Sequence, residues 1–426
     1  MYRILNIDIY KVFLQTYFLL LLSSPVIAYI LYPYIGWGVD LVMGLGITLL
    51  FIIQRIVDSK KAMQFPRFLY LVIPLFIYHF IWDSFNNTIQ DQGLLSYLIK
   101  NQSIHIFCGI LLIYNTRFDE GLIKKIIIGI KITIVAAFLT TVYQLLYDFT
   151  FLIPPEMFKQ EIIESLEVGS IYELRNHSFF LYSSRNEIGY SYIPLISVFF
   201  GFYLTKKINL IKIAPYLLMA GFVCFATNGR YMQLGFLLVM IQYLIINRKN
   251  LKKSLLNMLL IGLVGILFYI CFVVFFVGYD LQQYIEQRIL SDSAGTRILA
   301  LESVFKFFPQ NMWFGTGVDT KTIEIITFLR GRSSQIHVGY FACLISYGLI
   351  GSIILFGLWG SVYSYLYRSA KFSNYYGTLF AFIMFLWVNV VMIYYYFFTY
   401  GIMLAFVFDK YFRDRAMDKK PESASS

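Results

Sequence analysis

Arginine side chains recur in three polar segments that lie far apart in the sequence. They are Arg175 and Arg185, then Arg230, then Arg288, Arg297, Arg330 and Arg332. A guanidinium group is a planar fork of N–H donors that pairs bidentately with phosphate oxygens. If the three segments converge, the set could bind a diphosphate, which needs several donors at once. For any single arginine, the alternative is a surface charge paired with a nearby Glu or Asp.

His337 is one of four histidines and stands where a polar segment meets a long apolar run. An imidazole can accept a proton near neutral pH, so His337 is a candidate general base. The alternative is a polar residue that only starts a helix at a membrane interface. Three carboxylates could act as the base instead, and no spacing selects among Glu187, Glu286 and Asp292.

A second polar group falls near the ends of two apolar runs and consists of His79, Asp83, Lys100 and His105. Such residues can be helix-packing partners as readily as substrate contacts. The chain has no Gly-rich nucleotide loop, no HExxH motif and no carboxylate-rich metal motif, and its four cysteines lie inside apolar runs. These observations predict no metal, no cofactor and no soluble nucleotide-sugar donor.

The composition indicates a membrane protein. Hydrophobic residues make up 59% of the 426-residue chain and charged residues 14%, whereas soluble domains have roughly 45–50% and 25%. The mean hydropathy is +0.67. A formal charge of +11 would suggest nucleic acid in a soluble protein, but here membrane topology accounts for most of it. We therefore predict an all-α polytopic membrane protein with no nucleic-acid partner.

Apolar runs of roughly twenty residues, long enough to cross about 30 Å of hydrocarbon, define the spans. We predict twelve, at 12–32, 37–54, 67–82, 94–114, 126–152, 187–205, 209–227, 230–247, 254–278, 337–367, 375–391 and 393–408. The last two are the least clear, because no turn separates them. Residues 1–408 then form one transmembrane domain, and 409–426 form a cytoplasmic tail.

Lysine and arginine fall in every second connection, after spans 2, 4, 6, 8 and 10, and again in the tail. By the positive-inside rule both termini are cytoplasmic, and the other connections face outward. The two long outer loops are then 153–186 and 279–336. These loops and the turn at 228–230 carry seven arginines but three lysines. Topology alone would not select arginine there, whereas phosphate binding would.

Four short stretches have a recognisable order. They are Ser183-Ser-Arg185-Asn186-Glu-Ile-Gly189, with Gly201 completing an Arg-x15-Gly spacing; Phe225-Ala-Thr-Asn-Gly-Arg230; Thr296-Arg297-Ile-Leu-Ala-Leu301, followed by Trp313-Phe-Gly315-Thr-Gly317; and His337, with Gly348 and Gly351 downstream. The chain thereby resembles the O-antigen polymerase (Wzy-type) and O-antigen ligase superfamily of bacterial membrane glycosyltransferases. Ligases often have Asn after this histidine, where the chain has Val338, and this difference favours a polymerase.

The resemblance implies a GT-C-like membrane fold and a metal-independent glycosyltransferase of the bacterial inner membrane. Such an enzyme transfers an undecaprenyl-diphosphate-linked glycan to a sugar hydroxyl at the outer face. Arg297 and His337 would be catalytic, with His337 as the base. The diphosphate and the glycan would bind to Arg185, Arg230, Arg288, Arg330 and Arg332. The implied partners are the lipid-linked oligosaccharide, membrane lipid and a chain-length regulator protein.

Three functions fit these residues. A polymerase joins lipid-linked repeat units to each other, whereas a ligase transfers the glycan to lipid A core. A glycolipid flippase or other transporter is the alternative from a different class. Transporters usually place ionisable groups at mid-membrane and use repeated halves. In this sequence the charges avoid the centres of the predicted spans and no repeat is visible, which favours an enzyme.

Overall fold

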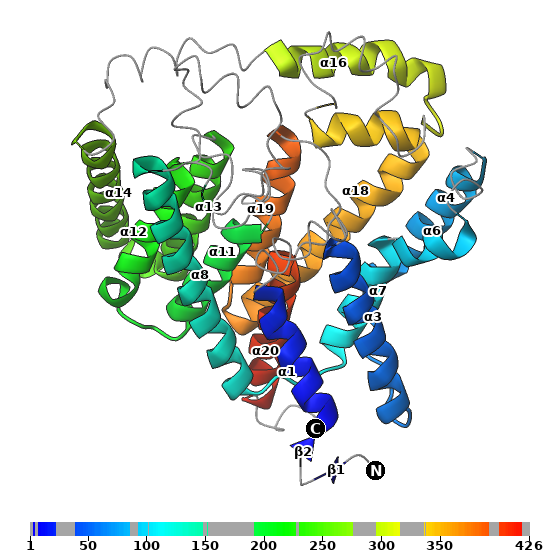
Figure 1. Ribbon diagram of the computed structural model, residues 1–426, viewed down its shortest axis with the longest axis horizontal. Coiled ribbons are helices and arrows are strands. Elements are labelled where there is room, and N and C mark those ends of the chain that lie inside the picture. The colour runs from blue at the N-terminus through cyan, green and yellow to red at the C-terminus, as the bar shows by residue number, and fades with distance from the viewer. Residues whose placement is uncertain are drawn as a thin grey trace.

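The computed structural model of the chain describes residues 3–4, 7–22, 39–85, 93–100, 102–147, 151, 191–226, 230–275, 295–315, 336, 338–391 and 400–419. A few residues at helix ends within these ranges have a described backbone only. The described part is a bundle of helices, with one helix lying across an end (Figure 1). Its strands are a two-residue antiparallel pair, β1 (Arg3–Ile4) and β2 (Ile7–Asp8).

The helices follow one another in three groups. The first is α1 (Ile9–Leu22), α3 (Val39–Val57), η2 (Arg67–Leu71), α4 (Val72–Phe85), α6 (Leu94–Lys100), α7 (Gln102–Tyr114) and α8 (Glu120–Leu146). The second is α11 (Ile193–Thr205), α12 (Leu210–Ala226), α13 (Arg230–Ile246), η6 (Arg248–Asn250) and α14 (Leu251–Phe275). The third is α16 (Gly295–Phe307), η7 (Phe308–Asn311), α18 (Gly339–Ser373), α19 (Gly377–Val391) and α20 (Tyr400–Asp418).

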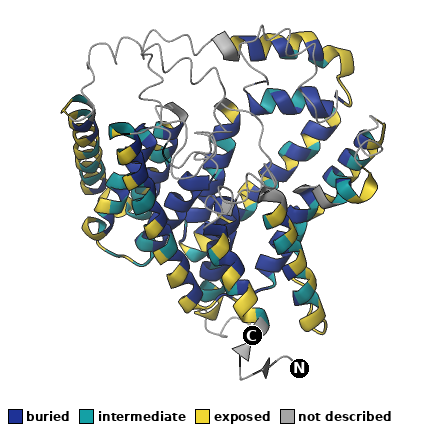
Figure 2. Ribbon diagram, in the orientation of Figure 1, coloured by how far each residue is buried: buried dark blue, intermediate teal, exposed yellow. Residues whose placement is uncertain are grey.

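The predicted all-α membrane class is confirmed, and every predicted span contains a helix. Four helices are long and apolar enough to cross a membrane: Arg67–Phe85, Glu120–Leu146, Arg248–Phe272 and Gly339–Ser373. Seven of the other described helical segments are apolar but shorter. Burial differs widely among the long ones: 11% of the apolar window of Arg248–Phe272 is buried, against 56% for Gly339–Ser373. Figure 2 shows the exposed positions along α14. Several of them are leucines, and an apolar surface of this extent is stable in contact with lipid chains but not in water.

The centre of the bundle is built where α11, α13 and α19 pack closely. A Cβ atom at Gly201 would lie 2.7 Å from the Gly377 Cα atom, so the two helices approach backbone to backbone. The buried Ser197 hydroxyl donates to the Gly377 carbonyl at 2.7 Å and accepts from the Gln242 amide at 3.0 Å. Close helix packing therefore explains why residue 201 is a glycine.

Three predicted boundaries differ from the observed helices. The segment 94–114 forms two helices, α6 and α7, because the polar run Lys100-Asn-Gln interrupts the apolar sequence. Helix α8 begins at Glu120, six residues before the predicted span at 126, because Asp119 caps it by accepting from the Leu122 N–H at 2.7 Å. Helix α20 continues past the predicted start of the tail at 409 to Asp418, since its residues 411 and 412 pack in the core.

Ion pairs join helix ends and connections at the end of the bundle opposite α16, where α1 begins and α20 ends (Figure 1). Lys11 at the start of α1 pairs with Asp119 at 2.7 Å. Glu120 pairs with Lys206, just after α11, at 3.5 Å and with Arg415 of α20 at 3.3 Å. Segments that the positive-inside rule predicts to be cytoplasmic therefore meet at one end of the molecule.

Candidate functional site

Helix α16 lies over the first part of α18, and the two are joined by a small hydrophobic cluster separate from the main core (Figure 1). We call it the outer cluster; it consists of Leu299, Ala300, Phe307, Ile336, Val338, Ala342 and Ile345. Most of these side chains are almost fully buried, with Ala300 and Ile336 at 0% exposure. The late loop predicted at 279–336 is therefore not wholly irregular, because part of it folds back onto the next span as a packed helix.

The outer cluster contains sequence neighbours of the two residues predicted to be catalytic. His337 is outside the described residues, but its neighbours Ile336 and Val338 both belong to the cluster. Arg297 is in α16, and its side chain is not among those described; Leu299, two residues on, is in the cluster. The segments that carry Arg297 and His337 are thus held together through their neighbours.

Helix α18 is broken nine residues after it begins. Gly348 has φ of 59° and ψ of −164°, a conformation almost confined to glycine. At the break, backbone N–H groups that would form hydrogen bonds within a continuous helix are available to other acceptors. The Leu349 N–H donates to the Met312 carbonyl at 2.7 Å, and the Ile350 N–H donates to the Trp313 carbonyl at 3.1 Å. The segment after α16 therefore caps the second part of α18.

The cap is fixed by contact between two glycines. A Cβ atom at Gly348 would lie 2.5 Å from the Gly315 N atom, and one at Gly315 would lie equally close to the Gly348 N atom. Gly315 itself has a φ of 78°, in the left-handed region that favours glycine. No other residue fits at either position without moving the backbone. The loop is consequently held to the break in α18 at a fixed distance.

Tyr78 of α4 bridges the two sides of this junction. Its hydroxyl oxygen lies 2.6 Å from the Phe314 carbonyl oxygen and 2.5 Å from the Tyr347 carbonyl oxygen. The hydroxyl has one proton and donates to one carbonyl at a time. Its ring also occupies the space beside Gly351, where a Cβ atom would clash with it. A third segment of the chain therefore supports the break.

The polar group near the ends of spans 3 and 4 contributes packing contacts around the same junction. The His79 ring stacks on Tyr347 at 4.6 Å between ring centroids. Asp83 accepts a hydrogen bond from the Tyr97 hydroxyl at 2.7 Å. His105 lies elsewhere, with its Nδ1 atom 3.0 Å from the Thr48 hydroxyl. These three residues are helix-packing partners, the first of the two roles predicted for them; the side chain of Lys100 is not described.

The remaining predicted site residues are only partly placed. Arg230 is the first residue of α13, which begins at the end of the bundle where α16 lies (Figure 1); its side chain is not described. The other arginines lie outside the described residues, and they are Arg185, Arg288, Arg330 and Arg332. The alternative bases also lie outside them, and they are Glu187, Glu286 and Asp292. Convergence of the arginines on one site remains a prediction.

Lys131 of α8 bears on the transporter alternative, because it is a charged residue inside a long apolar helix. Because α8 begins at Glu120, Lys131 lies near the middle of this 27-residue helix rather than near its start. Its ammonium group is over the rings of Tyr203 and Tyr216, at 5.4 and 5.1 Å from their centroids. Cation–π contacts of this kind stabilise a charge away from water. Because α8 extends beyond the predicted span at its start, the expectation that charges avoid span centres stays a prediction at this position.

Residues 215–356 match the protein-family model described as O-antigen ligase. The match covers a third of the chain and supports the predicted O-antigen polymerase and ligase superfamily. The matched segment runs from α12 into the second part of α18 and includes Arg230, Arg297, His337, Gly315 and Gly348. Members of this superfamily are membrane glycosyltransferase-like enzymes. Comparison with curated proteins finds no match to the chain.

Proposed function

We propose that the protein is a polymerase that joins repeat units of O-antigen or a related surface polysaccharide. The donor is a glycan linked to undecaprenyl diphosphate, and the acceptor is a sugar hydroxyl on a second lipid-linked repeat unit. The observation that supports this proposal best is the outer cluster, which joins the segment after Arg297 to the residues on both sides of His337. The match of residues 215–356 to the O-antigen ligase family supports the same class of chemistry.

In this reaction the acceptor oxygen forms a bond to the anomeric carbon of the donor glycan. The bond from that carbon to the diphosphate breaks, and undecaprenyl diphosphate leaves with the electron pair. His337 takes the proton from the acceptor hydroxyl. Arg297 stabilises the charge that develops on the diphosphate. The remaining binding residues in this proposal are Arg185, Arg230, Arg288, Arg330 and Arg332. No metal and no cofactor takes part in the proposed step.

The proposal includes the finer features predicted from the sequence. The chain crosses the bacterial inner membrane twelve times in a GT-C-like arrangement, and both termini are cytoplasmic. The outer junction formed by α16, residues 312–315 and the break in α18 then faces the lipid-linked substrate. The partners are the undecaprenyl-diphosphate-linked oligosaccharide, membrane lipid and a chain-length regulator protein.

Complementation of a deletion strain tests the proposal. Arg297→Ala and His337→Ala should each leave surface polysaccharide with single repeat units, visible as loss of the ladder on a gel. Arg368→Ala is the matched control, because Arg368 lies in the second part of α18, beyond the break and away from the outer junction. Full-length ladders from both outer variants, at normal protein levels, would contradict the assignment.

A ligase is the second candidate, and the description of the matched family favours it directly. The two functions differ in the acceptor, which is lipid A core for a ligase. Loss of a ligase removes even single repeat units from the core, whereas loss of a polymerase leaves them. One deletion and one gel therefore separate the two candidates.

A further inference from the structure

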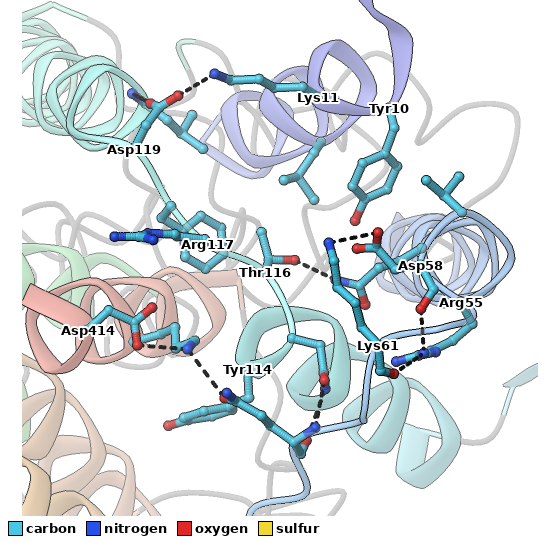
Figure 3. Close-up of a pocket in the computed structure, with 18 of the residues that line it drawn as sticks. Tyr10, Lys11, Arg55, Asp58, Lys61, Tyr114, Thr116, Arg117, Asp119 and Asp414 are labelled. Atoms are coloured by element: carbon cyan, nitrogen blue, oxygen red, sulfur yellow. Dashed lines mark hydrogen bonds and ion pairs between the residues drawn. The ribbon is translucent and has the colours of Figure 1, made fainter. Parts of the chain in front are cut away.

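A cavity of about 710 Å³ opens at the end of the bundle opposite α16. Its walls are the starts of α1 and α8, the ends of α3, α7 and α20, and the connections at 58–64 and 115–119 (Figure 3). We call it the basal cavity. All of its lining residues belong to the described part of the chain. None of the arginines proposed to bind the glycan donor lines it, so it is separate from the outer junction.

The lining of the basal cavity carries both signs of charge. Its cations are Lys11, Arg55, Lys61, Arg117 and Lys410, and its carboxylates are Asp58, Asp119, Asp414 and Asp418. Five cations against four carboxylates leave little net charge. A ligand that is only anionic would therefore gain little from the lining as a whole, whereas a ligand with one group of each sign could pair with both sets.

Several of these charges can exchange partners at small cost. The pair Lys61–Asp58 has side chains 74% and 28% exposed, and the pair Arg117–Asp418 has side chains 80% and 59% exposed. Exposed ion pairs contribute little to stability, because water screens the two charges. A bound ligand could thus replace one member of such a pair. The Lys410–Asp414 pair, with side chains 6% and 18% exposed, is the fixed part of the wall.

Two adjacent residues near the end of α3 indicate the chemistry of the ligand. Arg55 donates to the carbonyls of Asp58 and Lys61 at 3.0 and 3.1 Å and forms no ion pair within the described residues. Gln54 is 2% exposed, and its amide group donates to the Thr116 hydroxyl at 2.9 Å. Its Oε1 atom has no hydrogen-bond donor among the described residues. The Arg55 guanidinium can therefore bind an anion. The Gln54 Oε1 atom can accept a hydrogen bond from a donor on the ligand.

The surroundings of the cavity are apolar on the membrane side. Phe13 of α1 is 59% exposed, and Ile52, Ile56 and Val57 of α3 are 48%, 68% and 48% exposed. These side chains belong to the same two helices that line the cavity, and exposed apolar side chains on membrane helices contact lipid chains. A ligand whose charged head enters the basal cavity can therefore keep its hydrocarbon tails along α1 and α3.

We propose that the basal cavity binds the headgroup of an aminophospholipid, in which a phosphate is joined to a primary ammonium group. The phosphate pairs with the Arg55 guanidinium. The ammonium donates to Gln54 Oε1 and to a carboxylate of the lining, the nearest in sequence being Asp58. The acyl chains lie against the exposed apolar side chains of α1 and α3.

Lipid titration of the purified full-length protein in detergent tests the proposal. Dioleoylphosphatidylethanolamine should raise the thermal unfolding midpoint in a saturable way. Dioleoylphosphatidylglycerol lacks the ammonium and should raise it by less than half as much. Dioleoylphosphatidylcholine has an ammonium without N–H groups, so it should also be weaker. The water-soluble headgroup glycerophosphoethanolamine should have no effect at the same concentration.

Substitutions at Arg55 and Gln54 test the phosphate contact and the ammonium contact separately. Arg55→Ala should need about tenfold more phosphatidylethanolamine for the same shift, equivalent to the loss of one charge-assisted hydrogen bond. Gln54→Leu should reduce the preference for phosphatidylethanolamine over phosphatidylcholine, because it removes one of the two acceptors of the ammonium group. Arg248→Ala, an exposed cation outside the cavity, should behave as the unchanged protein.

Three results would overturn the proposal. The first is an equal or larger shift with phosphatidylglycerol. The second is an unchanged preference for phosphatidylethanolamine in both Arg55→Ala and Gln54→Leu. The third is an equal shift with glycerophosphoethanolamine, which would identify a soluble ligand instead of a lipid.

Discussion

The outer junction and the basal cavity lie at opposite ends of one bundle and are built from different contacts. At the outer junction, Gly315 and Gly348 meet backbone to backbone, and Tyr78 bridges two carbonyls. Around the basal cavity, half-exposed charged side chains pair across helix ends. Backbone contacts fix a geometry, whereas exposed ion pairs can rearrange. This difference suits positioning of reacting groups at one end and binding of a lipid at the other.

Gly348→Ala should have the largest effect on stability. The positive φ costs about 1–3 kcal/mol for a residue with a Cβ atom, and the added atom would also lie 2.5 Å from the Gly315 N atom. We expect a loss of several kcal/mol in the free energy of unfolding, measured by denaturation in detergent. Gly360→Ala in the same helix is the control, since no atom lies within 4 Å of its Cβ position. Equal stability of the two variants would refute the fixed junction.

Tyr78→Phe should have the next largest effect. The change removes the hydroxyl that bridges Phe314 and Tyr347 and leaves the ring in place. The bond to Phe314 is exposed and the bond to Tyr347 is half-buried, so the loss of a partner by the Tyr347 carbonyl costs about 1–2 kcal/mol. Faster hydrogen exchange at the Leu349 and Ile350 amides would show that the cap has loosened. Tyr70→Phe, at a residue 61% exposed, should leave both exchange rates unchanged.

Asp119→Ala tests the charged end through its dependence on pH. The hydrogen bond from Lys11, followed by that from the Leu122 backbone, holds the pKa of Asp119 below its usual range. A carboxylate with a lowered pKa contributes stability above its unfolded pKa of about 4 and loses it as pH falls further. We expect a loss of about 0.5–2 kcal/mol at pH 7, typical of a missing N-cap.

The difference between Asp119→Ala and the unchanged protein should shrink in thermal unfolding as pH falls from about 4 towards 3. Asp119→Asn is the matched control, because Asn keeps the cap on α8 and removes only the charge. It should lose less stability than Asp119→Ala at pH 7. A difference that stays constant over the whole pH range would contradict the ionised cap.

Lys61→Ala should have the smallest effect. Its ammonium group lies 2.9 Å from Asp58, but its side chain is 74% exposed. Such a pair contributes less than about 1 kcal/mol, and added salt should reduce the effect of the change further. Thermal unfolding at low and high salt measures it. An effect larger than that of Tyr78→Phe would show that the charged end is as rigid as the outer junction.

The sequence predicted the membrane class and a helix within each of the twelve spans, because apolar runs of this length have few alternatives. It did not predict α16, which lies in the polar segment predicted to be a loop. It did not predict the break in α18, since the run from 339 to 367 is apolar on both sides of Gly348. The extension of α8 to Glu120 was missed because Lys124 and Lys125 look like a connection. In the structure both lysines are part of the helix that Asp119 caps.

The candidate site was predicted in part. The resemblance singled out Gly315 and Gly348 as separate motifs, but nothing in their spacing indicated that they touch. Tyr78 carried no signal at all, because one tyrosine among 35 does not stand out. Gln54 was also missed, since a glutamine at the end of an apolar run indicates no ligand by itself. Contacts between segments more than 200 residues apart depend on packing, which local patterns do not encode.

Chain growth by the purified protein tests the central claim most directly. The protein would be reconstituted in liposomes with undecaprenyl-diphosphate-linked repeat units, without lipid A core and without any other enzyme. We expect products of several repeat units and release of undecaprenyl diphosphate, and no such products from His337→Ala or Arg297→Ala at equal folded amounts. Growth at the same rate in both variants would contradict the account.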